Sequence, residues 1–139
     1  MLSLGFVTQF RISEAASLLG VSDDTLRRWI ASGALSSSTD AAGRQAVDGA
    51  QLAALAAQRA TAPSDPSVIG SSARNRLVGL VTAIVSDPVM SQVELQCGPH
   101  RMVSLMSTEA VRELGLEVGA LAVAVVKATM VIVETPREP

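Results

Sequence analysis

The chain has 139 residues, which is enough for one domain or two small ones, and 48% of them are apolar. The formal net charge is -2, and the aromatic residues are only two Phe and one Trp, with no Tyr. These values argue against a bulk positive field and against base stacking on aromatic side chains, so any DNA contact must come from locally placed arginines. There is no apolar run of about 20 residues and no signal-peptide pattern at the start of the sequence, so a cytoplasmic location is expected.

One cysteine and one histidine lie close together in "QCGPH". A single cysteine, Cys97, excludes an internal disulfide and a cysteine-based zinc site. Cys97 and His100 could form a metal or nucleophile pair, or they could flank a tight turn. Because two residues cannot complete a zinc shell, we expect the turn and no metal.

The first part of the chain has the periodicity of short helices. "RISEAASLLG" predicts a helix capped by Ser13 and ended by Gly20. "VSDDTLRRWIASGAL" predicts a second helix, capped by Ser22 and ended by Gly33. Two short helices joined at residues 20–22 form a helix-turn-helix arrangement.

A third helix is predicted from "VDGAQLAALAAQ", where Asp48 is the expected cap and Gln51 has the spacing of a capping box. Within the second helix, Trp29 lies on the apolar face and is expected to pack in the core. Arg27 and Arg28 point away from that face. They are either a solvated surface or, in view of the surrounding pattern, contacts to nucleic acid.

Over residues 9–56, the segments "FRISEAASLLGVSDDTLRRWIASGAL" and "GRQAVDGAQLAAL" resemble the winged helix-turn-helix of the MerR and excisionase-like families. The resemblance implies an all-α winged helix-turn-helix domain over residues 1–60, with residues 23–31 as the recognition helix. It also implies contacts to double-stranded DNA from Thr25, Arg27, Arg28 and, on the wing, Arg44. The wing is less basic than is usual in these families, so binding as a dimer to paired half-sites is expected.

Residues 61–70 are predicted to be a linker, because the Pro- and Gly-containing stretch "ATAPSDPSVIG" breaks both helical and strand periodicity. Beyond it, over residues 71–139, five short β-branched runs predict strands: "RLVGLVTAIV", "SQVELQC", "RMVSLM", "ALAVAVV" and "MVIVE". "STEAVRELGL" predicts one short helix, capped by Ser107 or Thr108 and ended by Gly115. This order matches a five-stranded OB-like β-barrel, and the expected fold class of the whole chain is α+β.

A small set of polar residues interrupts the apolar strands of this second part. A tetrahedral oxyanion needs convergent hydroxyls, backbone N–H groups and cationic side chains. Lys127 breaks an apolar run, where a lysine is costly unless its ammonium reaches water or an anion. The polar residues that fit such a site are Ser72, Arg74, Asn75, Ser107, Lys127 and Thr129. Turn or strand capping is the alternative for Arg74 and Asn75.

Residues 71–134, with "SARN" at the entry, "EAVRELGL" in the helix and "VKAT" in the last strand, resemble a molybdate-binding Mop (TOBE) domain. The resemblance implies molybdate or tungstate as bound ligand. The residues implied to hold it are Ser72, Arg74, Asn75, Ser107, Lys127, Ala128 (by its backbone) and Thr129. The family often has a Ser where this chain has Ala110, and the neighbouring Thr108 is a candidate substitute. Sites between domains imply a homo-oligomer, at least a dimer and up to a trimer of dimers.

Together, the two resemblances imply a molybdate-responsive transcription regulator that binds double-stranded DNA. The alternative is a molybdate storage or buffering protein, in which the first part of the chain serves assembly. No membrane partner is expected. An enzyme is not expected either, because the sequence has no paired carboxylates, Ser-His-Asp set or phosphate-cradling glycine loop.

Overall fold

The structure is a computed structural model, and it describes residues 8–67 and 69–136. The chain divides into two compact units, Met1–Thr61 and Ala62–Pro139, which are described separately here. Most of the stretch that the sequence analysis assigns to a linker therefore belongs to the second unit.

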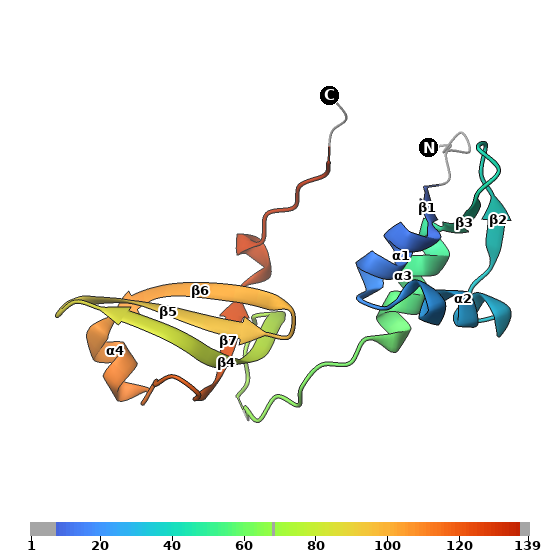
Figure 1. Cartoon of the computed structure of the whole chain (residues 1–139). Coiled ribbons are helices and arrows are strands. Elements are labelled where there is room, and N and C mark those ends of the chain that lie inside the picture. Colours follow the sequence, from blue (N-terminus) through green and yellow to red (C-terminus); the bar gives the residue numbers. More distant parts are fainter. Residues whose placement is uncertain (1–7, 68, 137–139) are drawn as a thin grey trace. The chain divides into compact units, whose positions relative to one another are not determined.

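The first unit combines a helix pair, a β-hairpin and a third helix (Figure 1). Its elements are β1 (Gln9–Arg11), α1 (Ile12–Leu19), α2 (Asp23–Ala31), β2 (Ser37–Thr39), β3 (Gln45–Asp48) and α3 (Gly49–Arg59). The strands form an antiparallel sheet in the order β1-β3-β2. This corrects the all-α description of the unit: the wing is a β-hairpin that turns at Gly43, whose φ is 78°, and its inner strand β3 also pairs with β1, which precedes α1.

Local sequence predicts most of the helix ends correctly. Gly20 adopts the left-handed conformation that ends α1, with φ 68°. The Ser22 hydroxyl caps α2 by accepting a hydrogen bond from the backbone N–H of Thr25 at 3.1 Å. The prediction for Ser13 is wrong, because the N-cap of α1 is Arg11, two residues earlier.

The third helix begins as predicted, with the Asp48 carboxylate accepting a hydrogen bond from the backbone N–H of Gln51 at 3.1 Å. The Gln51 side chain does not complete a capping box, because its oxygen accepts instead from the backbone N–H of Ser36 at 3.2 Å. Trp29 packs against the core of the unit, as expected, and the guanidinium of Arg59 lies 4.9 Å from its ring centroid. The buried core is Ile12, Ala15, Ala16, Leu26, Leu35, Val47, Leu52 and Leu55.

The second unit is a curled antiparallel sheet with one helix at its end (Figure 1). Its elements are β4 (Asn75–Ser86), β5 (Met90–Cys97), β6 (His100–Ser107), α4 (Thr108–Glu113), β7 (Leu121–Val126) and a short 3-10 helix, η1 (Ala128–Met130). The strand order is β6-β5-β4-β7. The long β4 pairs with β7 along its first half and with β5 along its second, and a register shift between Val81 and Ala83 lies where the partners change.

The fifth predicted strand, residues 130–134, is not formed. Within residues 69–136 the sheet has four strands, and the chain leaves it at Lys127 to enter η1. A strand needs the backbone of a partner, and no strand of the described chain pairs with this segment. The side chains of Met130, Ile132 and Val133 are consequently 72%, 84% and 84% exposed.

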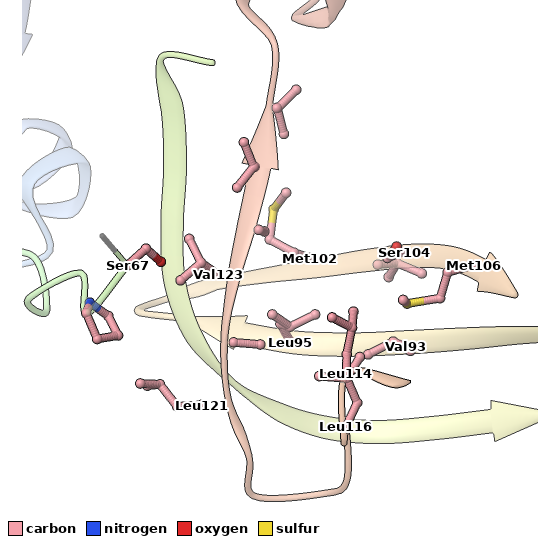
Figure 2. Close-up of a pocket in the computed structure, with 16 residues that line it drawn as sticks. Ser67, Val93, Leu95, Met102, Ser104, Met106, Leu114, Leu116, Leu121 and Val123 are labelled. Atoms are coloured by element: carbon pink, nitrogen blue, oxygen red, sulfur yellow. The ribbon is translucent and has the colours of Figure 1, made fainter. Parts of the chain in front are cut away.

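Because the fifth strand is missing, the barrel is open between β6 and β7, which are the two edges of the sheet. The opening is a hollow of about 560 Å³. Figure 2 shows apolar side chains turned into it from three strands, among them Leu95, Met102 and Val123, and Leu116 from the loop after α4. The buried core of the unit is formed by Val81, Val93, Leu95, Cys97 and Val111, of which Val93 and Leu95 also line the hollow.

The "QCGPH" segment is a tight turn, as expected. Cys97 and His100 pair at the ends of β5 and β6, and Gly98 between them has φ 59°. The Cys97 thiol is buried and donates to the carbonyl oxygen of Leu77 at 3.6 Å, so it has a packing role.

Candidate functional site

The pairing of β4 with β7 joins two of the predicted oxyanion-binding segments. Asn75 opposes Val126 in this ladder, and its side-chain Nδ2 donates to the Val126 carbonyl oxygen at 3.1 Å. Arg74 therefore lies next to the point where β7 ends, and Lys127 follows directly. Both cationic side chains belong to exposed residues, whereas Asn75 is partly buried.

The remaining predicted residues near this junction lie in its two flanking segments. Ser72 is exposed in the turn before β4, where the neighbouring Ser71 hydroxyl accepts from the backbone N–H of Ala73 at 3.1 Å. Ala128 and Thr129 are exposed in η1, directly after Lys127. The structure thus brings the "SARN" and "VKAT" segments to one end of the sheet.

Ser107 lies at the opposite end of the same sheet. It is the N-cap of α4, and its hydroxyl accepts from the backbone N–H of Ala110 at 3.0 Å. The sheet register places it beside the end of β4 that carries Ser86, whereas Asn75 begins that 12-residue strand. At about 3.3 Å per residue, β4 extends over roughly 35 Å. Figure 1 shows α4 at one end and η1 at the other, so Ser107 and Lys127 of one chain do not meet.

Thr108 does not replace the hydroxyl that Ala110 lacks. Its side chain is buried, and its Oγ1 donates to the carbonyl oxygen of Asp87 at 2.7 Å. The same oxygen lies 2.8 Å from the hydroxyl of buried Ser91. Thr108 therefore ties α4 to the β4–β5 turn, and turning its hydroxyl toward a ligand would break this network.

Two other arginines of the second unit are already paired with acids. Arg76 Nε donates to the Asp65 carboxylate at 2.8 Å, and this hydrogen bond is the main cause that lowers the pKa of Asp65 to about 2. Arg101 pairs with Glu94 and lowers the pKa of that carboxyl. Within the described part of the second unit, Arg74 and Lys127 are in no ion pair.

The predicted DNA-binding residues of α2 fall into two arrangements. Arg28 donates to the Thr25 hydroxyl at 3.0 Å, and that hydroxyl also accepts from Ser22 Oγ at 3.0 Å. Arg27 lies 3.7 Å from the carboxylate of Asp24, which is almost fully exposed, so this ion pair is weak.

Arg27 and Arg44 line one open hollow of about 370 Å³, together with Arg11, which the sequence analysis does not select. Thr25 and Arg28 do not line it. A signal for Arg11 was present in the sequence: it directly precedes the first helix, where Ser, Thr, Asp or Asn is the usual capping residue.

Within residues 8–67 and 69–136 no three His, Cys, Asp or Glu residues gather as a metal site would require. No helix in these ranges has both the length and the apolar character to cross a membrane.

Comparison with known proteins gives a separate family match for each of the two units. Residues 71–133 match the TOBE domain family, and residues 10–60 match a helix-turn-helix domain family. The chain is 36% identical over 66 residues to the molybdenum transport protein ModE of Herbaspirillum seropedicae, a match that covers 47% of this chain and 24% of ModE. It is 44% identical over 63 residues to the probable molybdenum-pterin-binding protein of Haemophilus influenzae, covering 45% of this chain and 91% of that protein.

Among solved structures, a molybdate-binding protein from Sporomusa ovata is 30% identical, with a TM-score of 0.47 and coverage of 48% of this chain and 100% of that one. The chain matches about a quarter of ModE but nearly all of the Haemophilus protein. Through residues 71–133 the chain belongs to the TOBE domain family, and it carries a helix-turn-helix domain at residues 10–60.

Proposed function

We propose that this protein is a molybdate-responsive, DNA-binding transcription regulator. In this proposal, the second unit binds molybdate or tungstate between copies of the chain, and the first unit binds double-stranded DNA in the cytoplasm. One observation carries it: Arg74 and Lys127, two cations without an ion pair in the described part of their unit, lie at the same end of the sheet. The choice of molybdate rests on the names of the relatives and on the family resemblance.

The chemistry of the Arg74–Lys127 end suits a doubly charged oxyanion. Two cations supply charge, and charge-assisted hydrogen bonds to an anion are about twice as strong as neutral ones. Asn75 uses one amide N–H on Val126, which leaves its second N–H for a ligand. The hydroxyls of Ser72 and Thr129 and the backbone N–H of Ala128 complete the proposed set from this chain.

Ser107 can join this set only from another copy of the chain, because it lies at the far end of its own sheet. We therefore place the site between copies, with the Ser107 hydroxyl and the first turn of α4 contributed by a neighbour. The lack of a hydroxyl at Ala110 leaves Ser107 as the contributor from that helix.

Assembly is supported by apolar surface that one chain leaves uncovered. Leu105 on the edge strand β6 is 71% exposed, and residues 130–133 pair with no strand among residues 8–67 and 69–136. A segment that is apolar, strand-like in sequence and unpaired is well suited to add to the edge of a second copy. We propose that at least a dimer forms in this way.

In the first unit, we propose that α2 is the recognition helix and that Thr25, Arg27, Arg28 and Arg44 contact DNA. The planar guanidinium of arginine can donate two hydrogen bonds at once to a guanine edge or to a phosphate.

Regulation requires that the oxyanion bind two arrangements of the assembly with different affinity. A tenfold change in operator affinity needs about 1.4 kcal/mol of coupling.

The primary test is a calorimetric titration of the purified full chain with molybdate, tungstate and sulfate, alongside measurement of the oligomeric mass. We expect molybdate or tungstate to bind with a defined stoichiometry per chain and sulfate to bind more weakly. Absence of molybdate and tungstate binding by an assembled, folded protein would contradict the proposal.

A second function, oxyanion storage, is favoured by the match to the Haemophilus protein, 91% of which is covered by the TOBE region alone. A triple variant, Arg27→Ala, Arg28→Ala and Arg44→Ala, separates the two functions. If the wild-type chain binds a DNA duplex and the triple variant does not, while molybdate binding is retained, the regulator is supported. If no duplex is bound by the wild type, storage is the better description.

A further inference from the structure

Three arginines from different parts of the first unit gather around one hollow. Arg11 is the last residue of β1, Arg27 lies in α2, and Arg44 directly precedes β3. The β1–β3 ladder explains part of this convergence, because Arg11 opposes Ala46 and so lies close to the start of β3. The hollow has a volume of about 370 Å³, and its other lining residues are Ile12, Ser13, Asp23 and Gln45.

Among the residues that line this hollow, positive charges outnumber negative ones. Asp23 is the one carboxylate among the lining residues, against three guanidinium groups. Within residues 8–67, Arg11 and Arg44 form no ion pair, and Arg27 has only its 3.7 Å contact with exposed Asp24. Asp40 and Glu14 lie nearby: Asp40 accepts from the backbone N–H of Arg44 and Glu14 from that of Arg11.

Arg11 occupies a position where its side chain cannot cap the helix that follows. It is the N-cap of α1, and a guanidinium has no acceptor for the N–H groups at the start of the helix. The Arg11 side chain accepts no hydrogen bond from the helix, and Ser13 in the first turn lines the hollow. The start of this eight-residue helix adds a partial positive charge to that of the arginines, which the Glu14 carboxylate in the same turn partly offsets.

We propose that this hollow binds a backbone phosphate of DNA and that Arg11 is one of its ligands, with Arg27 and Arg44. The inference rests on the proposed DNA-binding function and adds a residue and a role to it. A phosphate contact carries no sequence information but fixes the register of the recognition helix on the duplex. Arg28, which lies outside the hollow, is left to reach base edges.

The test uses the full chain and a mixed-sequence 30-base-pair duplex, with binding followed by fluorescence anisotropy from about 50 to 200 mM salt. The informative variant is Arg11→Thr, because threonine is a good N-cap and is compatible with the extended backbone at this position (φ -68°, ψ 161°). We expect Tm to rise while duplex affinity falls several-fold. The slope of log K against log salt should decrease in magnitude by about 0.9, the value for one lost phosphate contact.

Arg59→Gln is the matched control, because it removes one positive charge from the same unit at a residue that lies over Trp29 and outside the hollow. Its salt slope should match that of the wild type. An unchanged affinity and slope in Arg11→Thr would overturn the inference while leaving the proposed function intact. A loss of affinity together with a lower Tm would also overturn it, by assigning Arg11 to folding. If the wild-type chain bound no duplex, the proposed function itself would fail.

Discussion

Asn75 Nδ2 donates to the carbonyl oxygen of Val126 at 3.1 Å, across the ladder that joins the first strand of the TOBE unit to its last. This single contact fixes the entry of β4 beside the exit of β7. Two segments separated by some fifty residues of sequence are held next to each other, and each contributes a cation.

Lys127→Ala is expected to weaken molybdate binding by about 10- to 100-fold, because a hydrogen bond to a charged group contributes about 1.5–3 kcal/mol. Calorimetric titration of the assembled protein measures the effect. Arg112→Ala, which removes an exposed cation from α4, is the control and should bind as the wild type does. Equal affinities in the two variants would remove Lys127 from the site.

The double substitution Ile132→Lys and Val133→Lys is expected to dissociate the oligomer, because it places two charges on the segment that we propose to pack against a second copy. Sedimentation velocity should show a shift toward the mass of the single chain. Val118→Lys, at a residue that is 66% exposed elsewhere in the same unit, is the control. A double variant that still sediments as the wild type would show that this segment lies outside the interface.

Gly79→Ala is expected to destabilise the second unit by about 1–3 kcal/mol through overpacking. A Cβ at this position would lie 2.5 Å from the Gln96 carbonyl oxygen and 2.6 Å from Cys97 Sγ, so the β4–β5 pair would have to separate. Urea unfolding measures the loss. Gly70→Ala is the control, because a Cβ there meets no atom within 4 Å, and its urea midpoint should equal that of the wild type. Equal midpoints in both variants would contradict this description of the sheet.

The Asp65–Arg76 ion pair predicts a pH dependence. The pKa of Asp65 is lowered from 3.8 to about 2, chiefly by the hydrogen bond from Arg76. Because the folded-state pKa is the lower one, the pair stabilises the protein above pH 4 and this contribution is lost as the pH falls from about 4 to about 2. Thermal unfolding should give a lower Tm for Asp65→Asn than for the wild type at pH 6, with the difference vanishing near pH 2.

Glu113→Gln, at an exposed carboxylate of α4, controls for the loss of one acidic charge in the same unit. Its Tm should stay close to that of the wild type across this range. If the Tm difference between Asp65→Asn and the wild type is the same at pH 6 and at pH 2, the ionised Asp65 carboxylate does not stabilise the fold through its pair with Arg76.

Features that depend on residues close together in the chain can be predicted from the sequence. Gly20 ends α1, and Ser22 and Asp48 cap their helices, because a left-handed glycine or a short oxygen-bearing side chain acts within one helical turn. The order of elements and the turn at Gly98 follow from the same local chemistry. At the start of α1, the local pattern predicts a cap at Ser13, whereas the observed cap is Arg11, two residues earlier, which the pairing of β1 with β3 positions.

Which residues from distant parts of the sequence lie together cannot be predicted in this way, because it depends on the folded chain. Register and sheet curvature bring Arg74 and Lys127 to one end, place Ser107 at the other, and leave residues 130–134 without a strand partner within the described chain. The cluster of Arg11, Arg27 and Arg44 around one hollow likewise forms only in the folded chain. Strand pairing joins residues that are far apart in sequence. A segment's strand propensity indicates that it can pair with another strand, but it does not specify which strand edge it pairs with. The positions of these residues relative to one another are therefore set only when the sheet forms.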